Sequence, residues 1–437
     1  MDQAEPARKE PLLNSWLLLF LFAMILANIG GSMYDPILPL YLQQLNASIS
    51  DVGWFFTLSR ILPLAMLILG GYISDSLGRL RSIAMGSIAG VFTYVALILA
   101  PTWQWVLVAS MFSAITSALI MPSFPAFIAE HSTESNRARV FGISETLFMI
   151  VMVVGPPLGG WLAQTYSFKK MFIVAGAFYL VATVIRVAMA REAARGRESS
   201  PQKPSLSGLK VNLSAMMLLI TAGGIVTWIL ITDGVRDVAF SLSGNLFPIF
   251  GRDFIGLSIT QIGWMSSLFG VAMMLTNFPA GWLSDKAGER VCIVIGFFLQ
   301  AVAISLLVLV PRLSLASASI GWIVAGVGVG IMNPAYQSLI SKAVPQKIRG
   351  TAFGLFSSSL GVVSMPAPAI GAWMWQSVSP RAPFAITALA SLLAMIPAWF
   401  KFKIEKPAEE QPLPEPLPLV APGDVLQDDQ GTLRPLD

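Results

Sequence analysis

The chain has 437 residues, of which 55% are hydrophobic and only 12% are charged. Because soluble domains carry about 25% charged residues, this composition excludes an ordinary soluble protein and indicates that most of the chain lies in a lipid bilayer. One cysteine and one histidine exclude an intrachain disulfide and a Cys/His metal cluster, and a net charge of +4 without a basic run argues against nucleic-acid binding.

Twelve apolar stretches follow a polar N-terminal segment, 1–15, which lacks the layout of a cleaved signal peptide. About 20 apolar residues span the hydrocarbon core as a helix, so these stretches are long enough to cross the membrane. The predicted membrane helices, numbered 1 to 12 in chain order, are 16–42, 51–73, 82–101, 104–128, 139–164, 168–190, 221–250, 259–283, 291–311, 315–342, 350–375 and 381–401.

The lysines and arginines are distributed unevenly over the loops between these helices. Of the 28, 20 lie on the side of the two termini, five lie on the opposite side and three fall inside spans. Because the cytoplasmic loops of membrane proteins are enriched in Lys and Arg, we predict a multi-pass protein of the plasma membrane with both termini in the cytoplasm.

The predicted helices divide into two sets of six. Residues 16–190 are expected to form an N-terminal bundle and residues 221–402 a C-terminal bundle, joined by a polar and basic cytoplasmic linker, 191–220. Residues 403–437 contain seven prolines and eight acidic residues. Such a segment cannot bury enough apolar surface to fold, so we predict a disordered cytoplasmic tail.

The two sets of helices share a repeated pattern. Three residues of the loop after helix 2 recur 210 positions later, after helix 8: Gly71, Asp75 and Gly78 return as Gly281, Asp285 and Gly288. A shift of 212 carries Pro156 onto Pro368 and Gly159 onto Gly371. We therefore predict an all-α membrane protein of twelve transmembrane helices in two pseudo-twofold-related six-helix bundles, with a cavity between them near the midplane.

Two of these motifs resemble those of the major facilitator superfamily. The loop after helix 2 has its signature glycines, aspartate and arginines, and a weaker copy follows helix 8: Gly71, Asp75, Gly78, Arg79 and Arg81, then Gly281, Asp285, Gly288 and Arg290. The stretch VVGPPLGG resembles the helix-5 motif of its drug-efflux, proton-antiporter branch, with Gly155, Pro156, Gly159 and Gly160. The resemblance covers roughly residues 12–402 and implies the major facilitator fold.

The resemblance also implies how the cytoplasmic gate closes. In the family, the loop aspartate holds the N-terminal half against the start of helix 11, so Asp75 would act there as a latch. A carboxylate is favourable near a helix N-terminus. By pseudo-symmetry Asp285 would face the start of helix 5 near Arg139. Arg79 is placed to pair with Glu130, and the gate also includes the repeated Arg137 and Arg349. Alternatively, these charges only enforce the membrane topology.

Charged residues inside spans are candidates for function, because a charge at the bilayer centre costs at least about 2.5–3.5 kcal/mol. Asp35 in helix 1 and Arg60 in helix 2 lie at similar depth on neighbouring helices and are placed to pair. Pro36 disfavours regular helix at Asp35. The two residues either form a structural ion pair or handle substrate and protons.

Helix 7 carries Asp233, Arg236 and Asp237, whose spacing puts them on one face. The repeat maps Asp237 onto Asn28, so both are expected near mid-membrane across the pseudo-twofold axis. This set suits a proton or cation site.

Two further charges lie nearer the ends of helices 5 and 6. Glu145 in helix 5 is either a solvated acid near a helix N-terminus or part of the site. Arg186 is expected to extend to the cytoplasmic headgroups. Helix 4 lacks the charged residue that many proton-coupled relatives carry.

These features predict a secondary active transporter, not an enzyme. It would export a small amphipathic, drug-like solute by alternating access in exchange for protons. No nucleotide-phosphate loop is present, and no metal or cofactor is expected. The expected partners are the small-molecule substrate, protons and the bilayer, with the protein as a monomer. The alternatives are a sugar or organic-acid symporter or uniporter, and a non-transporting receptor on the same fold.

Overall fold

The computed structural model describes residues 15–63, 66, 78–133, 136–195, 224–309, 314–343, 361, 363–403, 426–427 and 433–434. The chain divides into one compact unit that ends at Phe402 and a second unit, Lys403–Asp437. In the second unit, β1 (Leu426–Gln427) and β2 (Leu433–Arg434) pair as a short antiparallel ladder. All the other described elements are helices.

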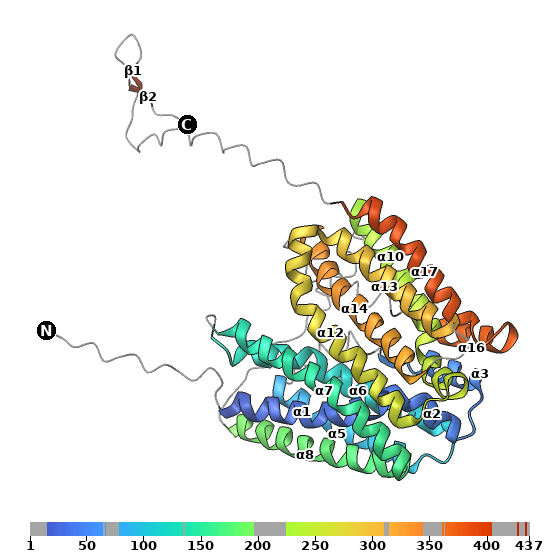
Figure 1. Ribbon diagram of the computed structural model, residues 1–437. Helices are drawn as coiled ribbons and strands as arrows, with labels where there is room; N and C mark the ends of the chain where they lie inside the picture. Colours follow the sequence, from blue (N-terminus) through green and yellow to red (C-terminus); the bar gives the residue numbers. More distant parts are fainter. Residues whose placement is uncertain are drawn as a thin grey trace. The chain divides into compact units, whose positions relative to one another are not determined.

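The N-terminal bundle is drawn in blue to green in Figure 1. Its helix 1 is α1 (Ser15–Tyr34), η1 (Asp35–Ile37) and α2 (Leu38–Gln44), and α3 (Ile49–Leu58) is the described part of helix 2. Helices 3 to 6 are α5 (Arg79–Leu99), α6 (Trp103–Glu130), α7 (Arg137–Thr165) and α8 (Phe168–Arg195).

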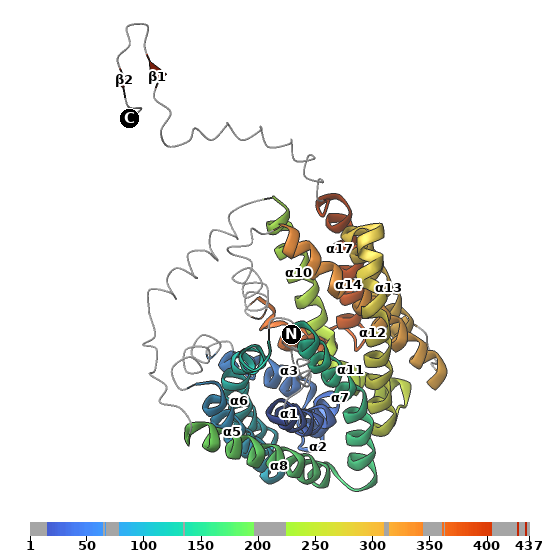
Figure 2. The same ribbon diagram turned by 90° about the vertical axis from the view of Figure 1, so that its left-hand side faces the viewer.

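The C-terminal bundle is drawn in yellow-green to red and groups apart from the first bundle in Figure 2. Its helix 7 is α10 (Gly224–Ser243), η2 (Gly244–Leu246) and α11 (Phe247–Phe250), which the π-helical turn η3 (Gly251–Ile255) follows. Helices 8 to 10 are α12 (Ile259–Ala287), α13 (Glu289–Leu309) and α14 (Leu315–Ala343). Helix 11 is described in α16 (Ala367–Ser377), and helix 12 is α17 (Ala382–Lys401).

The predicted spans coincide with these helices. In the described part of the chain, nine helices are long and apolar enough to cross a membrane. The other three predicted spans are helices 2 and 11, which extend outside the described residues, and helix 7, whose α10 carries three charged residues. The protein is therefore an all-α, multi-pass membrane protein.

The first helix of each bundle breaks at the equivalent place. In helix 1 the α-helical pattern gives way at Asp35–Ile37, because Pro36 and Pro39 lack the backbone N–H that an α-helix requires. In helix 7 the same three-residue turn occurs at Gly244–Leu246, just before Pro248. The two turns are 209 positions apart, so the predicted repeat extends to backbone geometry.

Two further pairs of positions show the same symmetry. Gly78 has φ +87° and ψ 151°, and Gly288 has φ +88° and ψ 150°. Residues with a side chain rarely adopt this conformation, which explains why glycine recurs before helices 3 and 9. Ser48 and Ser258, 210 positions apart, each start the next helix with a capping box.

The two bundles meet through a pair of symmetric helix crossings. α3 packs against α16, where a Cβ at Gly53 would lie 2.7 Å from the Pro368 carbonyl oxygen. α7 packs against α12, where a Cβ at Gly263 would collide with the Pro156 carbonyl oxygen. A third contact between equivalent positions joins Arg252 Nη2 to Gln43 Oε1 at 2.7 Å. All three contacts lie toward the end of the bundles that carries Gln43 and Arg252, which we call the clasped end.

Candidate functional site

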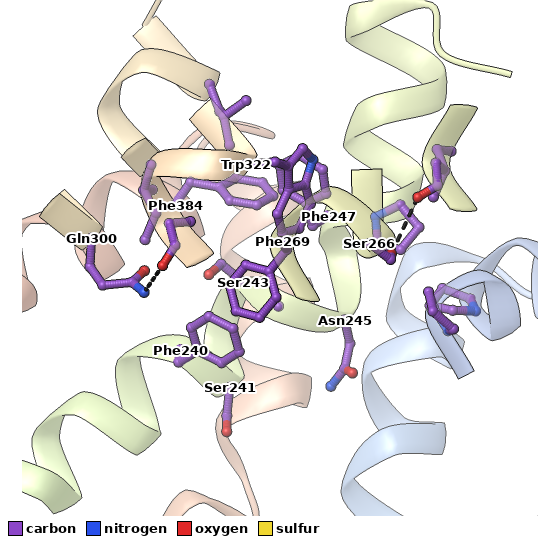
Figure 3. A pocket seen from close by; sticks show the side chains of 18 of the residues that line it. Phe240, Ser241, Ser243, Asn245, Phe247, Ser266, Phe269, Gln300, Trp322 and Phe384 are labelled. Atoms are coloured by element: carbon purple, nitrogen blue, oxygen red, sulfur yellow. Dashed lines mark hydrogen bonds between the residues drawn. The ribbon is translucent and has the colours of Figure 1, made fainter. Parts of the chain in front are cut away.

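A cavity of about 380 Å³ lies between the bundles, beside the breaks in helices 1 and 7. Five aromatic side chains of the C-terminal bundle line it: Phe240, Phe247, Phe269, Trp322 and Phe384 (Figure 3). Phe247 meets Trp322 edge to face at 4.4 Å between ring centroids, and Phe269 meets the same indole at 5.9 Å. The breaks therefore open onto a largely apolar surface with room for a drug-sized ligand.

Polar groups line the rest of this aromatic cavity. The N-terminal bundle contributes Asp35 and Arg60, and the C-terminal bundle contributes Ser241, Ser243, Asn245, Ser266 and Gln300. The amide of Gln300 donates to the Ala325 carbonyl oxygen at 2.9 Å, as Figure 3 shows. Nε1 of Trp322 is buried and has no hydrogen-bond partner in the described part of the chain. A ligand with an acceptor group could use this donor.

Asp35 faces the aromatic cavity from the break in helix 1. Asp35 is exposed, although it lies deep in the molecule, because it also lines two adjoining cavities. The ion pair with Arg60, one of the two alternatives that the sequence left open, is not formed. Nη1 of Arg60 donates instead to Ser241 Oγ at 3.0 Å and Ser364 Oγ at 3.2 Å, across the bundle interface. Equal depth does not fix the direction of a side chain, and hydroxyl groups of the other bundle lie within reach.

The charges of helix 7 share one side of α10, as their spacing predicts. Arg236 Nη2 pairs with Asp233 Oδ1 at 2.5 Å, and Cζ of Arg236 lies 5.3 Å from the centre of the Tyr336 ring. Asp233 is buried, whereas Asp237 is half-buried and close enough to Arg60 to interact with its charge. Two of the three predicted residues thus form an ion pair in which Asp233 is buried and Arg236 is half-buried, and the third lies close to Arg60.

A second cavity, of about 450 Å³, lies within the N-terminal bundle. Asn28 and Glu145 both line it, so the structure brings these two predicted residues to one place. Arg186 lines it as well. The prediction that Arg186 extends to the headgroups is wrong: the residue is only 3% exposed, because it lies on the face of α8 that packs on α5 and donates to Ser87 Oγ at 3.0 Å.

The predicted cytoplasmic gate is described in part, since Gly71, Asp75 and Arg349 lie outside the described residues. The predicted pair is present, with Arg79 Nε 3.3 Å from Glu130 Oε1. The C-terminal bundle carries the same pair with its charges exchanged, Glu289 and Lys342, and Ser338 donates to Glu289 at 2.8 Å.

The other described gate residues face outward or pack within their own bundle. Arg290 lies 4.7 Å from the centre of the Trp399 ring. Arg81, Arg137 and Asp285 are exposed. Asp285 belongs to none of the ion pairs in the described part of the chain, so its expected contact with the start of helix 5 near Arg139 is not formed in this conformation. The contacts between the bundles in the described part of the chain lie toward the clasped end instead.

The helix-5 motif packs against two neighbouring helices, α1 and α12. Gly155 and Gly159 let α7 approach α1 so closely that a Cβ would collide with Ser32 and with the Met33 carbonyl oxygen. Pro156 and Gly160 face α12 instead, where Thr260 Oγ1 donates to the Gly160 carbonyl oxygen at 3.3 Å. The motif is thus a crossing point of helices 1, 5 and 8.

Sequence reasoning missed three features of the site. The repeat contained a signal for the pair of Gln43 and Arg252, because the two positions are 209 apart and equivalent positions meet at a twofold axis. The bond from Arg60 to Ser241 and the aromatic lining had no such signal. Phenylalanine and serine are frequent throughout the apolar helices, and only packing selects the ones that face the cavity.

The fold and the cavity between two symmetric bundles define a membrane transporter. A family model described as Major Facilitator Superfamily matches residues 20–251 and 234–430. The chain therefore belongs to the major facilitator superfamily and is a transporter, not an enzyme.

Relatives agree with this assignment, and a solved structure has the same fold. The chain is 25% identical to a multi-drug resistance efflux pump PmrA homolog of Lactococcus lactis, over 85% of this chain and 91% of the relative. It is also 25% identical to multidrug resistance protein 1 of Bacillus subtilis, over 88% and 96%. A crystal structure of a peptide transporter, POT, in complex with sulfate matches with a TM-score of 0.73 at 13% identity, over 89% of this chain and 95% of that one.

Proposed function

We propose that the protein exports amphipathic organic cations across the plasma membrane in exchange for protons. The similarity to a multi-drug resistance efflux pump homolog and to a multidrug resistance protein supports efflux of drug-like solutes. The excess of Lys and Arg on the side of the termini supports an orientation with both termini in the cytoplasm.

The placement of Asp35 beside the aromatic cavity is the observation that carries this proposal. Aromatic faces and a carboxylate both attract an organic cation, and the rings also bury its apolar part. A proton neutralises the same carboxylate. Because the cation and the proton compete for one group, release of one accompanies binding of the other, which is the requirement for exchange.

Alternating access would follow from the positions of the bundle contacts. The Arg60 bonds to Ser241 and Ser364 and the contact of Gln43 with Arg252 hold the clasped end together. In the proposed cycle these contacts break when the predicted latch aspartates, Asp75 and Asp285, engage at the cytoplasmic end.

A transport assay in proteoliposomes tests the function. Vesicles loaded with DNA report ethidium entry by its fluorescence. An acid interior should drive ethidium uptake, because protons leave as the dye enters, and nigericin should abolish the uptake. Uptake that ignores the pH gradient would point to uniport. Uptake driven by an acid exterior would indicate symport, and absence of any transport would leave a receptor role.

A further inference from the structure

Arg186 is a buried cation that the proposed exchange reaction does not use. It lies inside the N-terminal bundle, 3% exposed, with Nη1 donating to Ser87 Oγ at 3.0 Å. Its Nε is buried and has no hydrogen-bond partner in the described part of the chain. None of the ion pairs found among the described residues includes Arg186. A buried arginine without an anionic partner costs free energy, so packing alone does not explain why an arginine is buried here.

The cavity that Arg186 lines has the size and lining of a ligand site. Its volume is about 450 Å³, and Arg186 and Glu145 are the charged residues among its described lining. Glu145 is exposed, and Tyr179, which also lines the cavity, is close enough to interact with Arg186. The rest of the wall is mostly apolar, with Met24, Ile120, Met121, Phe124 and Phe148.

This cavity lies near the aromatic cavity, with an intermediate cavity between them. Asn28 and Phe148 line both the Arg186 cavity and an intermediate cavity of about 280 Å³. The intermediate cavity in turn shares Asp35, Phe269 and Trp322 with the aromatic cavity. Asp35 therefore lies on the side of the intermediate cavity that faces the aromatic cavity, and the Arg186 cavity adjoins its other side within the N-terminal bundle.

We propose that the Arg186 cavity is a second binding site, specific for amphipathic solutes that carry a carboxylate. The charge of the guanidinium, which has no anionic partner in the described part of the chain, attracts the carboxylate, while Ser87 accepts from Nη1 and keeps the side chain oriented. The aromatic and methionine side chains cover the apolar part of the solute. The inference rests on the proposed transport function only for the route of entry, because binding itself can be measured without transport.

A pair of fluorescent probes tests the charge requirement on the unaltered protein. Dansylglycine and its methyl ester share one fluorophore and differ in the carboxylate. In a nonionic detergent, the protein should bind the acid about tenfold or more tightly than the ester, since the bond to a charged group is lost in the ester. Equal affinity for acid and ester would overturn the proposal, whatever the variants do.

Substitutions test whether Arg186 causes the preference for the acid over the ester. Arg186→Gln should remove the difference between acid and ester, and Arg186→Lys should keep part of it because the charge remains. Arg191→Gln is the matched control, since Arg191 lies on the same helix but is exposed. A preference that persists in a folded Arg186→Gln protein, or that disappears in Arg191→Gln, would overturn the assignment to Arg186.

The same measurements separate this proposal from the efflux function. Dansylglycine binding in detergent needs no gradient, and ethidium uptake in vesicles needs no carboxylate on the solute. Acid-selective binding without ethidium exchange would support the Arg186 site and contradict the proposed function. Ethidium exchange without acid-selective binding would support the proposed function and contradict the Arg186 site.

Discussion

At the residue scale, the break in helix 1 gives Asp35 its position. The proline that follows it ends the regular α-helix, and the carboxylate faces the space between the bundles instead of a neighbouring turn. Arg60, which lies at similar depth, is bonded to hydroxyl groups of the other bundle. Asp35 therefore keeps a carboxylate free for a cation or a proton, and Arg60 holds the interface.

Asp35→Asn should abolish ethidium uptake driven by an acid interior. The amide neither releases a proton nor attracts a cation, while its size is almost that of the carboxylate. The thermal unfolding midpoint in detergent should stay close to that of the unaltered protein, because no ion pair is lost. Glu192→Gln, an exposed acid near the end of α8, is the control and should transport normally. Gradient-driven uptake at the unaltered rate in Asp35→Asn would contradict the proposed role.

At the element scale, close helix crossings depend on glycines at equivalent places in the two bundles. A Cβ at Gly159 would collide with the Met33 carbonyl oxygen, and one at Gly371 with the Leu242 carbonyl oxygen. The repeat relates these positions: Gly159 maps onto Gly371 at a shift of 212, and Met33 maps onto Leu242 at a shift of 209. Helix 5 thus packs on helix 1 as helix 11 packs on helix 7.

Gly159→Ala should destabilise the protein by roughly 1–3 kcal/mol, because the added methyl group must push α7 away from backbone atoms of α1. The measurement is the thermal unfolding midpoint of the purified protein. Gly142→Ala on the same helix is the matched control, since its Cβ would meet nothing within 4 Å. If both variants unfold at the same temperature, the crossing is not as close as the structure shows.

The turns before helices 3 and 9 depend on backbone conformation alone. A Cβ at Gly78 or Gly288 would meet nothing within 4 Å, but both residues have φ near +87°. Replacement of either glycine by alanine should cost about 1–3 kcal/mol through backbone strain. Because the cause is the same in both bundles, the two variants should lower the unfolding midpoint by similar amounts. A large effect at only one of the two positions would contradict a shared cause.

At the scale of the whole molecule, transport requires the clasped end to open. Gln43 and Arg252 join the bundles there through one hydrogen bond between equivalent positions of the repeat. The proposed cycle breaks this contact once per turnover. A permanent link at this place should hold the protein in one state.

The test starts from Cys292→Ala, which removes the one cysteine of the chain, a buried one. Gln43→Cys and Arg252→Cys are then added together and linked by a short bifunctional maleimide. Linked protein should lose ethidium uptake, whereas each single-cysteine variant treated with the same reagent should keep it. Full uptake by the linked protein would show that the clasped end stays closed during transport, contrary to alternating access.

The sequence by itself determined the membrane environment, the helices, the twofold repeat and the ion pair of Arg79 with Glu130. These features depend on apolar run length and on spacing along the chain, which a sequence displays directly. The sequence also indicated the break at Asp35, because the proline that follows disfavours regular helix at that position.

Only the tertiary structure decided which charges meet. The bond of Arg60 to Ser241, the burial of Arg186 against Ser87 and the choice of the cavity's aromatic residues all depend on the rotation of each helix about its axis. Nearly uniform apolarity leaves this rotation undetermined, as Phe and Leu are equally suited to lipid, a neighbouring helix or a cavity. Close glycine crossings constrain the rotation, and some of them, such as those of Gly159 with Met33 and Gly371 with Leu242, act between segments more than 100 residues apart.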